Sequence, residues 1–227
     1  MAKINIKGDI VVNSWGWVYR FFGLDHVTPQ MVNDILAETP DDESIDVYIN
    51  SGGGHVTAGQ EIYSALRDDP RVHIHVVGMA CSAASIIACA GDSDISPVGM
   101  MMVHNVSGYA EGDCNEMEKA ERELRSMNEA LAMAYEAKSG MESDKLLEMM
   151  DRETWLTARQ CVEYGLIDRI SEPKQKAMAV NAIDYGLSVT PEMFAEAEAH
   201  RKAEQEAEAK RAEKTKAILD DLDAYGI

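Results

Sequence analysis

Residues 77–91 of the chain read VGMACSAASIIACAG. A β-rich run over residues 72–77 ends at Gly78, and small residues with an isoleucine pair continue to Gly91. This pattern predicts a buried strand, a tight turn at Gly78 and a short buried helix. Ser82 falls at or near the first turn of that helix, where free N–H groups and the helix dipole favour negative charge. Two interpretations stay open at this point: an activated nucleophile, or the ordinary N-cap of a core helix.

Strand-like and helix-like segments alternate around this stretch. Residues 3–12, 45–49 and 72–77 have the pattern of strands, and helices are expected from Thr28-Pro29 onward and over about residues 57–67. Strand, helix, strand, helix is typical of an α/β fold with a mainly parallel sheet and right-handed crossovers.

Length and composition restrict the function classes. A chain of 227 residues can bury one substantial core and carry an appendage. The net charge of −19 argues against binding to a phosphate backbone, so we expect no nucleic-acid partner. No apolar run is long enough for a membrane span and the N-terminus does not read as a signal peptide, so we expect a cytoplasmic protein without a membrane partner.

The cysteines and histidines do not suggest a metal site. Cys81, Cys89, Cys114 and Cys161 lack CxxC spacing, which favours a reducing compartment and no structural zinc. His73 and His75 share one face of a predicted strand with no third ligand nearby, so we interpret them as structural.

Two further features are candidates for a site. The run Gly52-Gly53-Gly54 follows a predicted strand and can be a plain turn or a place where backbone N–H groups line an oxyanion hole; the phosphate-binding patterns GxxxxGK[ST] and GxGxxG are absent. His104 ends the strand-like residues 100–104, where it can be a general base or a structural histidine.

The second half of the chain is helical in pattern. Residues 113–139 predict a long helix ended by Gly140, with a heptad seam of Met117, Ala120, Leu124, Met127, Leu131 and Ala134. A narrow apolar stripe of this kind packs against a partner subunit or against its own domain. Short helices at 143–150 and 157–164 and a last strand at 166–170 follow.

Composition shifts near Pro173. We therefore divide the chain into a folded domain, residues 1–172, and a charged C-terminal extension, residues 173–227, that is helical or partly disordered. The extension is expected to serve assembly or tethering rather than the active site.

Several spaced segments resemble the proteolytic subunit of the Clp proteases. They read NSGGG at 50–54, GMACSAA at 78–84, MVHN at 102–105, ETWLTA at 153–158 and EYGLID at 163–168. The resemblance covers roughly residues 3–171 in the family's order, and the set of motifs is more specific than any one of them. The GGG and ETW forms and the short N-terminus are most similar to the Clp-like head maturation proteases of tailed phages and prophages.

The resemblance implies a fold of the ClpP and crotonase type, with stacked βαβ units and the 113–139 helix as a handle. It implies a serine peptidase with Ser82 as nucleophile, Ser85 as a packing residue, and His104 as general base. The amides of Gly54 and Ala83 take the oxyanion-hole positions. Neither a cofactor nor a metal is required.

The third member of the triad is open between two carboxylates. The family usually has Asp, but an ungapped alignment back from residues 164–166 places Glu153 there, with Asp151 two residues earlier. Glutamate can orient an imidazole as aspartate does, so we take Glu153, with Asp151 as the alternative.

The resemblance also implies stacked rings, typically two heptamers, around a chamber that admits protein or peptide substrates. Because the chain starts almost at its first strand, the loops that engage an unfoldase are expected to be missing or reduced. The favoured hypothesis is therefore an ATP-independent, or weakly partner-dependent, endopeptidase that processes capsid or scaffold protein in the bacterial host. A housekeeping-type Clp peptidase working with an ATP-dependent unfoldase is the alternative.

Three other hypotheses remain. A crotonase would use the same hole for a thioester enolate, but the segment around Ser82 lacks the basic residues and catalytic glutamate that this requires. A non-catalytic assembly or scaffold subunit could keep the fold. Cys81 could act as a thiol nucleophile in place of Ser82.

Overall fold

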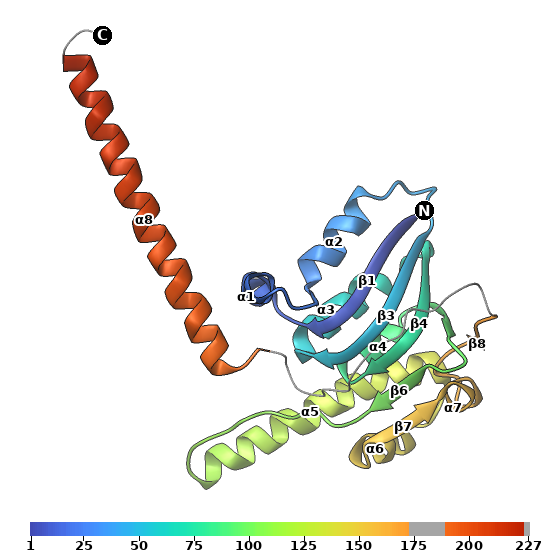
Figure 1. Cartoon of the computed structure of the whole chain (residues 1–227). Coiled ribbons are helices and arrows are strands. Elements are labelled where there is room, and N and C mark those ends of the chain that lie inside the picture. Colours follow the sequence, from blue (N-terminus) through green and yellow to red (C-terminus); the bar gives the residue numbers. More distant parts are fainter. Residues whose placement is uncertain (173–188, 225–227) are drawn as a thin grey trace.

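The computed structural model describes residues 1–172 and 189–224, with side chains described as far as residue 208. Within these residues the core of the molecule is one eight-stranded sheet (Figure 1). Its main path runs in the order β2 (His26–Val27), β1 (Ala2–Ile10), β3 (Ile45–Gly54), β4 (Val72–Cys81), β5 (Asp92–Ile95) and β8 (Arg169–Ile170), with every neighbouring pair parallel. The predicted α/β fold with a mainly parallel sheet is confirmed.

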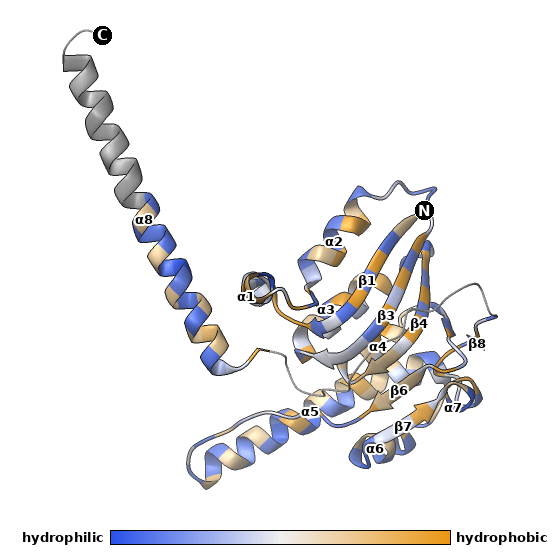
Figure 2. Ribbon diagram, viewed as in Figure 1, coloured by the Kyte–Doolittle hydropathy of each residue, from blue (hydrophilic) through white to orange (hydrophobic). Residues whose placement is uncertain are grey.

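The central strands form because β-branched residues recur at every second position. Ile4 and Ile6 of β1 and Ile74 and Val76 of β4 are all buried, and Figure 2 shows the resulting apolar bands along the strands. Helices α2 (Pro29–Glu38), α3 (Val56–Leu66) and α4 (Ala83–Ala88) pack against these strands. These helices cover the face of the sheet that carries the buried residues, whereas alternate residues of β1 such as Lys3 and Asn5 are exposed.

Helix α2 begins as the sequence predicts. Thr28 is the N-cap, and its side-chain oxygen accepts a hydrogen bond from the Met31 amide at 3.3 Å, while Pro29 occupies the first helical turn.

Strand β4 changes partner half-way along its length. His73–Val76 pair with Asp92–Ile95 of β5, whereas Met79–Cys81 pair with Met100–Met102 of β6 (Met100–Val103), which in turn pairs antiparallel with β7 (Thr154–Thr157). The predicted turn at Gly78 is therefore wrong. The strand continues to Cys81 because β6 supplies a second hydrogen-bonding partner.

The long helix is α5 (Cys114–Ser139), capped by Asp113, whose side chain accepts hydrogen bonds from two backbone amides of the first turn. Gly140 ends it in the left-handed conformation, as expected. Its inner turns bury Leu131 and Tyr135 in the core, whereas Met117 and Met127 of the outer turns are each 39% exposed. The seam thus packs on its own domain at one end and lacks such cover at the other.

Two short helices, α6 (Ser143–Asp151) and α7 (Ala158–Glu163), flank β7. Both lie within two residues of their predicted bounds. The last strand is shorter than predicted and covers only Arg169–Ile170.

The aromatic stretch after β1 forms a 3-10 turn (Asn13–Trp15) and α1 (Gly16–Phe22). Phe194 of α8 (Pro191–Ala224) lies against it, with ring centroids 5.7 Å from Trp15 and 6.1 Å from Trp17. His200 and Arg201 of α8 also contact α1, with the His200 ring 5.0 Å from the Phe21 ring and the Arg201 guanidinium 4.8 Å from the Trp17 ring. Beyond these residues α8, whose described side chains are mainly hydrophilic, extends away from the body (Figures 1 and 2). Residues 173–188, where the predicted extension begins, lie outside the described residues.

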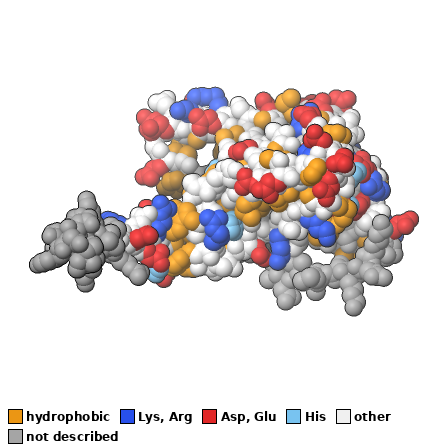
Figure 3. Space-filling view, turned by 90° about the horizontal axis from the view of Figure 1, so that it is seen from above, with side chains coloured by type: hydrophobic (Ala, Val, Ile, Leu, Met, Phe, Trp, Pro, Cys, Tyr) orange, Lys and Arg blue, Asp and Glu red, His pale blue; other side chains and the backbone are white. Residues whose placement is uncertain are grey.

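The described residues contain no helix with the length and apolarity that a membrane crossing would require. On the face drawn in Figure 3, acidic side chains are spread over the surface among separate basic groups, as the net charge of −19 leads one to expect.

Candidate active site

Ser82 connects β4 to α4 in a strained conformation. Its φ is +54° and its ψ is −125°, a region that non-glycine residues rarely adopt and that costs about 1–3 kcal/mol. The Ser82 amide donates to the Met102 carbonyl at 2.9 Å, so the pairing of β4 with β6 continues into the serine. The position at the mouth of α4 is the one that the sequence predicts.

Ser82 and His104 are in direct contact. The distance between Ser82 Oγ and His104 Nε2 is 2.8 Å. The contact follows from strand register, because Cys81 lies opposite Met102 and the two side chains project just beyond the carboxyl ends of parallel neighbours. If the hydroxyl donates, Nε2 must be the unprotonated ring nitrogen, which is the form that can take up the serine proton.

The electrostatic environment of His104 favours this neutral form. Burial lowers the pKa of the His104 imidazole below its ordinary value, and the negative charge of Glu153 offsets part of this effect. The histidine is therefore mainly neutral at neutral pH.

The structure separates the two carboxylates that the sequence left open. Glu153 lines the same cavity as Ser82 and His104, and its Oε1 accepts a hydrogen bond from Trp155 Nε1 at 3.4 Å. Asp151 instead accepts a hydrogen bond from Asn105 Nδ2 at 2.6 Å. The arrangement favours Glu153 as the carboxylate whose charge acts on the histidine.

The glycine run lies against the serine. A Cβ on Gly53 would come within 2.7 Å of both the Cys81 carbonyl oxygen and Ser82 Cβ, and the φ of Gly53 is +105°. Sequence reasoning missed this close approach, although three consecutive glycines were a signal for it. The Gly53 amide is already engaged, since it donates to Ser51 Oγ at 3.0 Å.

Gly54 is oriented differently. It lies opposite Ile10 of β1, and the Ile10 carbonyl accepts from the next residue, His55, at 2.7 Å. In a parallel pair of strands, a residue forms hydrogen bonds to the residues before and after the one directly opposite it. Because Gly54 is the residue opposite Ile10, its N–H points away from β1, towards the side of β4. Pairing of β3 with β4 ends at Ser51, which leaves this N–H beyond the ladder.

Ala83 is the first residue of α4, and its amide nitrogen would lie 3.1 Å from a Cβ built on Gly53. The predicted oxyanion-hole residues Gly54 and Ala83 are thus both in the immediate surroundings of Ser82. Amides so placed can stabilise negative charge that develops on a carbonyl oxygen.

The site opens into a cavity of about 610 Å³. Beside the polar groups its wall is apolar and includes Val56, Met102, Val106, Leu124, Leu131 and Tyr135. A cavity of this kind can take an apolar side chain and hold the adjoining carbonyl beside Ser82.

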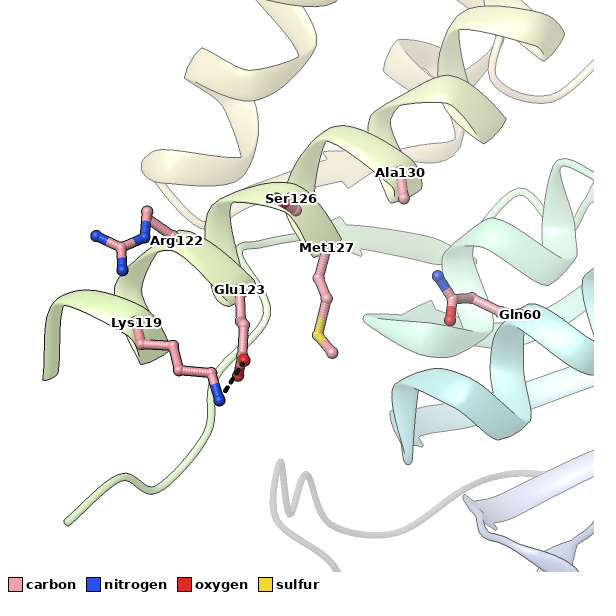
Figure 4. Close-up of a pocket in the computed structure, with 7 residues that line it drawn as sticks. All are labelled: Gln60, Lys119, Arg122, Glu123, Ser126, Met127 and Ala130. Carbon is pink, nitrogen blue, oxygen red and sulfur yellow. Dashed lines mark ion pairs between the residues drawn. The ribbon is translucent and has the colours of Figure 1, made fainter. Parts of the chain in front are cut away.

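A second hollow, of about 410 Å³, lies between α5 and α3 (Figure 4). It is lined by Gln60, Lys119, Arg122, Glu123, Ser126, Met127 and Ala130, and Lys119 and Glu123 form an ion pair of 3.8 Å across one side. It holds neither a histidine nor a cysteine, so nothing in its lining matches the chemistry at Ser82.

The cysteines are unsuited to replace the serine. Cys81 is fully buried, and burial raises the pKa of its thiol to about 11, so the nucleophilic thiolate is scarce at neutral pH. Among the described residues, no group of three or more His, Cys, Asp or Glu side chains is arranged to hold a metal ion. His73 and His75 contact Asp92 and Asp94 at 3.3 Å and 2.8 Å, away from the serine.

The sequence also matches a family model. Residues 24–174 match the model described as Clp protease, a span that takes in Ser82, His104 and Glu153. Because the match covers more than half of the 227 residues and the fold agrees with it, the chain belongs to the Clp protease family.

Proposed function

We propose that the protein is a serine endopeptidase in which Ser82 is the nucleophile and His104 the general base. Membership of the Clp protease family supports peptidase activity in general. The observation that carries the assignment of residues is the 2.8 Å contact between Ser82 Oγ and His104 Nε2.

In the proposed first step, Ser82 Oγ forms a bond to the scissile carbonyl carbon while its proton passes to His104 Nε2. The carbonyl electron pair moves to the oxygen, which accepts hydrogen bonds from the amides of Gly54 and Ala83. Glu153 stabilises the imidazolium that forms. When the C–N bond breaks, His104 returns the proton to the leaving amine, and an acyl-enzyme remains.

The second half repeats these steps with water. His104 removes a proton from a water molecule, the hydroxide attacks the acyl carbon, and Ser82 leaves with the proton that His104 returns. No step needs a cofactor.

We further propose that the peptidase acts inside a ring assembly and is independent of ATP, or only weakly dependent on an ATPase partner. The exposed outer half of α5, with Met117 and Met127, supports self-association, and the apolar cavity beside Ser82 supports a polypeptide substrate. The GGG and ETW forms support processing of capsid or scaffold protein as the physiological task.

The test compares wild-type protein with Ser82→Ala, His104→Ala and the control Ser64→Ala, which removes a hydroxyl that bonds only within α3. We expect a serine-directed fluorophosphonate to label wild type and Ser64→Ala, and Ser82→Ala to remain unlabelled. Peptide hydrolysis should fall by about two orders of magnitude or more in Ser82→Ala and His104→Ala. Unchanged hydrolysis by Ser82→Ala would refute the proposal.

Two measurements address the finer parts. Electron microscopy gives the symmetry of the particle, and degradation of an unfolded protein with and without ATP shows whether an ATPase is needed. Cleavage of a capsid or scaffold protein at defined bonds by wild type but not by Ser82→Ala would support the head maturation role, and indifference to such proteins would count against it.

A further inference from the structure

A buried chain of hydrogen bonds runs from α5 to the backbone of Ser82. The Tyr135 hydroxyl lies 2.7 Å from Ser85 Oγ, and Ser85 Oγ lies 2.6 Å from the Ser82 carbonyl oxygen. Ser85 is 0% exposed and Tyr135 is 1% exposed. The family assignment and the proposed mechanism give these two hydroxyl groups no role.

The direction of the chain follows from counting protons. A serine hydroxyl has one proton, and the Ser82 carbonyl can only accept, so the Ser85 proton points to Ser82. Tyr135 must therefore donate to Ser85. Burial raises the pKa of the Tyr135 phenol well above its usual value, so the donor keeps its proton throughout the working pH range.

The Ser82 carbonyl is fixed from two directions. Besides Ser85 Oγ, it accepts the Ser85 amide at 2.9 Å. The serine amide on the other side of the residue is held by the Met102 carbonyl at 2.9 Å. Both peptide groups of a residue in a strained conformation are thus restrained by neighbours.

The carbonyl of Ser82 and the amide of Ala83 belong to the same planar peptide group. Because the peptide bond is planar and trans, the N–H of Ala83 points opposite to the carbonyl of Ser82. The hydrogen bonds from Ser85 that fix the direction of this carbonyl therefore also fix the direction of the Ala83 N–H. That N–H is one of the two donors assigned above to the oxyanion hole.

We propose that Tyr135 is a positioning residue that aims the Ala83 amide at the oxyanion by holding Ser85 against the Ser82 carbonyl. The inference rests on the proposed function, because it assigns a purpose to the peptide group beside the nucleophile. The oxyanion exists only after Ser82 has attacked the peptide carbonyl. Loss of the hydrogen bond from Tyr135 to Ser85 should therefore lower kcat and leave the binding of uncleaved peptide nearly unchanged.

The first test is Tyr135→Phe, with Tyr19→Phe as the matched control. Tyr19 is also fully buried, and its hydroxyl donates to Asp9 at 2.9 Å, far along the chain from Ser82. We expect Tyr135→Phe to lower kcat at least about tenfold with KM within about twofold of wild type. Tyr19→Phe should keep the kinetic constants of wild type, although both variants lose some thermal stability.

A peptide boronate gives a readout that a merely structural role would not move, because its tetrahedral adduct with serine presents an oxygen to the oxyanion hole. Tyr135→Phe should bind the boronate at least about tenfold more weakly, in step with the loss in kcat. Equal boronate affinity in Tyr135→Phe and wild type would overturn the inference.

The double variant tests whether Tyr135 acts through Ser85. Ser85→Ala should lower kcat at least as much as Tyr135→Phe, and adding Tyr135→Phe to Ser85→Ala should lower it no further. If the two substitutions lower kcat additively, Tyr135 does not act through Ser85, and the inference is contradicted. Should Tyr135→Phe fail to fold, Ser85→Ala alone, measured for kcat, KM and boronate affinity, decides the matter.

The outcomes for the two proposals are separable. Wild type that is labelled at Ser82 and hydrolyses peptide, together with a fully active Tyr135→Phe, refutes the positioning role and leaves the proposed function intact. Wild type that neither hydrolyses peptide nor reacts with the fluorophosphonate refutes both.

Discussion

Ser82 and Glu153 are the two non-glycine residues with a positive φ in the described part of the chain, at +54° and +49°. They lie 71 positions apart, yet both face the same cavity as His104. Backbone strain of this kind costs about 1–3 kcal/mol per residue and is kept where the surrounding structure enforces it, often at a functional site. That both strained residues lie at one cavity points to a functional site there, independently of the sequence motifs.

Alanine at Gly53 should damage the site more than the fold. The new Cβ would lie 2.7 Å from Ser82 Cβ and from the Cys81 carbonyl oxygen, so the backbone on one side has to shift, which disturbs the contact of Ser82 with His104. We expect peptidase activity to drop at least about tenfold and the free energy of unfolding to fall by about 2 kcal/mol or more, from the clash and the left-handed backbone together. Activity assays and urea titration measure the two effects.

Gly140→Ala is the control for Gly53→Ala. Gly140 has a φ of +69° with no heavy atom near its Cβ position, so only the backbone cost of about 1–2 kcal/mol applies. Normal activity in both variants would contradict the placement of Gly53 against the nucleophile.

The pH profile should identify the third member of the triad. Because burial lowers the pKa of His104, kcat/KM should rise with pH and reach half its plateau below the ordinary histidine pKa of about 6.5. Glu153→Gln removes a charge that raises this pKa, so the midpoint should move to still lower pH. The plateau should also fall, at least about tenfold, because the imidazolium loses its counter-charge.

Asp151→Asn serves as the comparison in the same measurement. Since Asp151 accepts from Asn105, its variant should keep the midpoint of wild type. A shift in Asp151→Asn and none in Glu153→Gln would reverse the assignment of the two carboxylates.

Asp168 should contribute to stability by tying α5 to β5. Its Oδ2 accepts from Lys138 Nζ at 2.5 Å and from the Ser93 amide at 2.8 Å, and the Lys138 side chain is only 12% exposed. Asp168→Ala leaves a largely buried ammonium group without its counter-charge, which should cost about 1–3 kcal/mol in chemical denaturation. The exposed pair of Glu121 and Arg125 supplies the control, since Glu121→Ala should leave the free energy of unfolding nearly unchanged.

The stabilisation by Asp168 should also depend on pH. Burial raises the pKa of this carboxyl, but hydrogen bonds from Lys138 and Ser93 outweigh burial and lower it overall. A folded-state pKa below the unfolded value means that the contribution is complete above about pH 4 and is lost as the pH falls through the folded pKa. The difference between wild type and Asp168→Ala should therefore shrink on acidification, and a constant difference down to pH 2 would argue against the ion pair.

Thiol labelling should distinguish serine from cysteine chemistry. Cys114 is exposed, whereas Cys81, Cys89 and Cys161 are buried. Iodoacetamide should modify the folded protein only at Cys114, as mass spectrometry can show, and leave hydrolysis intact. Loss of activity on alkylation of Cys81 would instead support the alternative in which the Cys81 thiol is the nucleophile.

Local pattern was sufficient for much of the fold. The β-branched alternation of residues 45–49, the Thr28-Pro29 helix start and the glycine at 140 each act within a few residues, so a sequence shows them directly. Strand β4 was predicted four residues too short at its end, because what extends it is pairing with Met100–Met102, more than twenty positions away. The helix α1 was also missed, since its aromatic residues are held by contacts rather than by helix propensity.

The site shows the same division. Ser82 and His104 stood out because they occur in recognisable motifs, whereas the contact of Gly53 with the serine and the Tyr135–Ser85 hydrogen bond depend on three-dimensional proximity. Ser85 was interpreted as a packing residue, because no residue near it in the sequence indicates its hydrogen bond to Tyr135, fifty positions later.

Because β4 changes partner from β5 to β6, main-chain hydrogen bonds set the distance between Ser82 Oγ and His104 Nε2. Replacing one methionine of β6 by another apolar residue should leave that spacing as it is. Inserting a single residue between Met102 and His104 would turn the imidazole to the opposite side of the strand. At this point of β6 the geometry of the site therefore depends on the number of residues and not on which apolar side chains they carry.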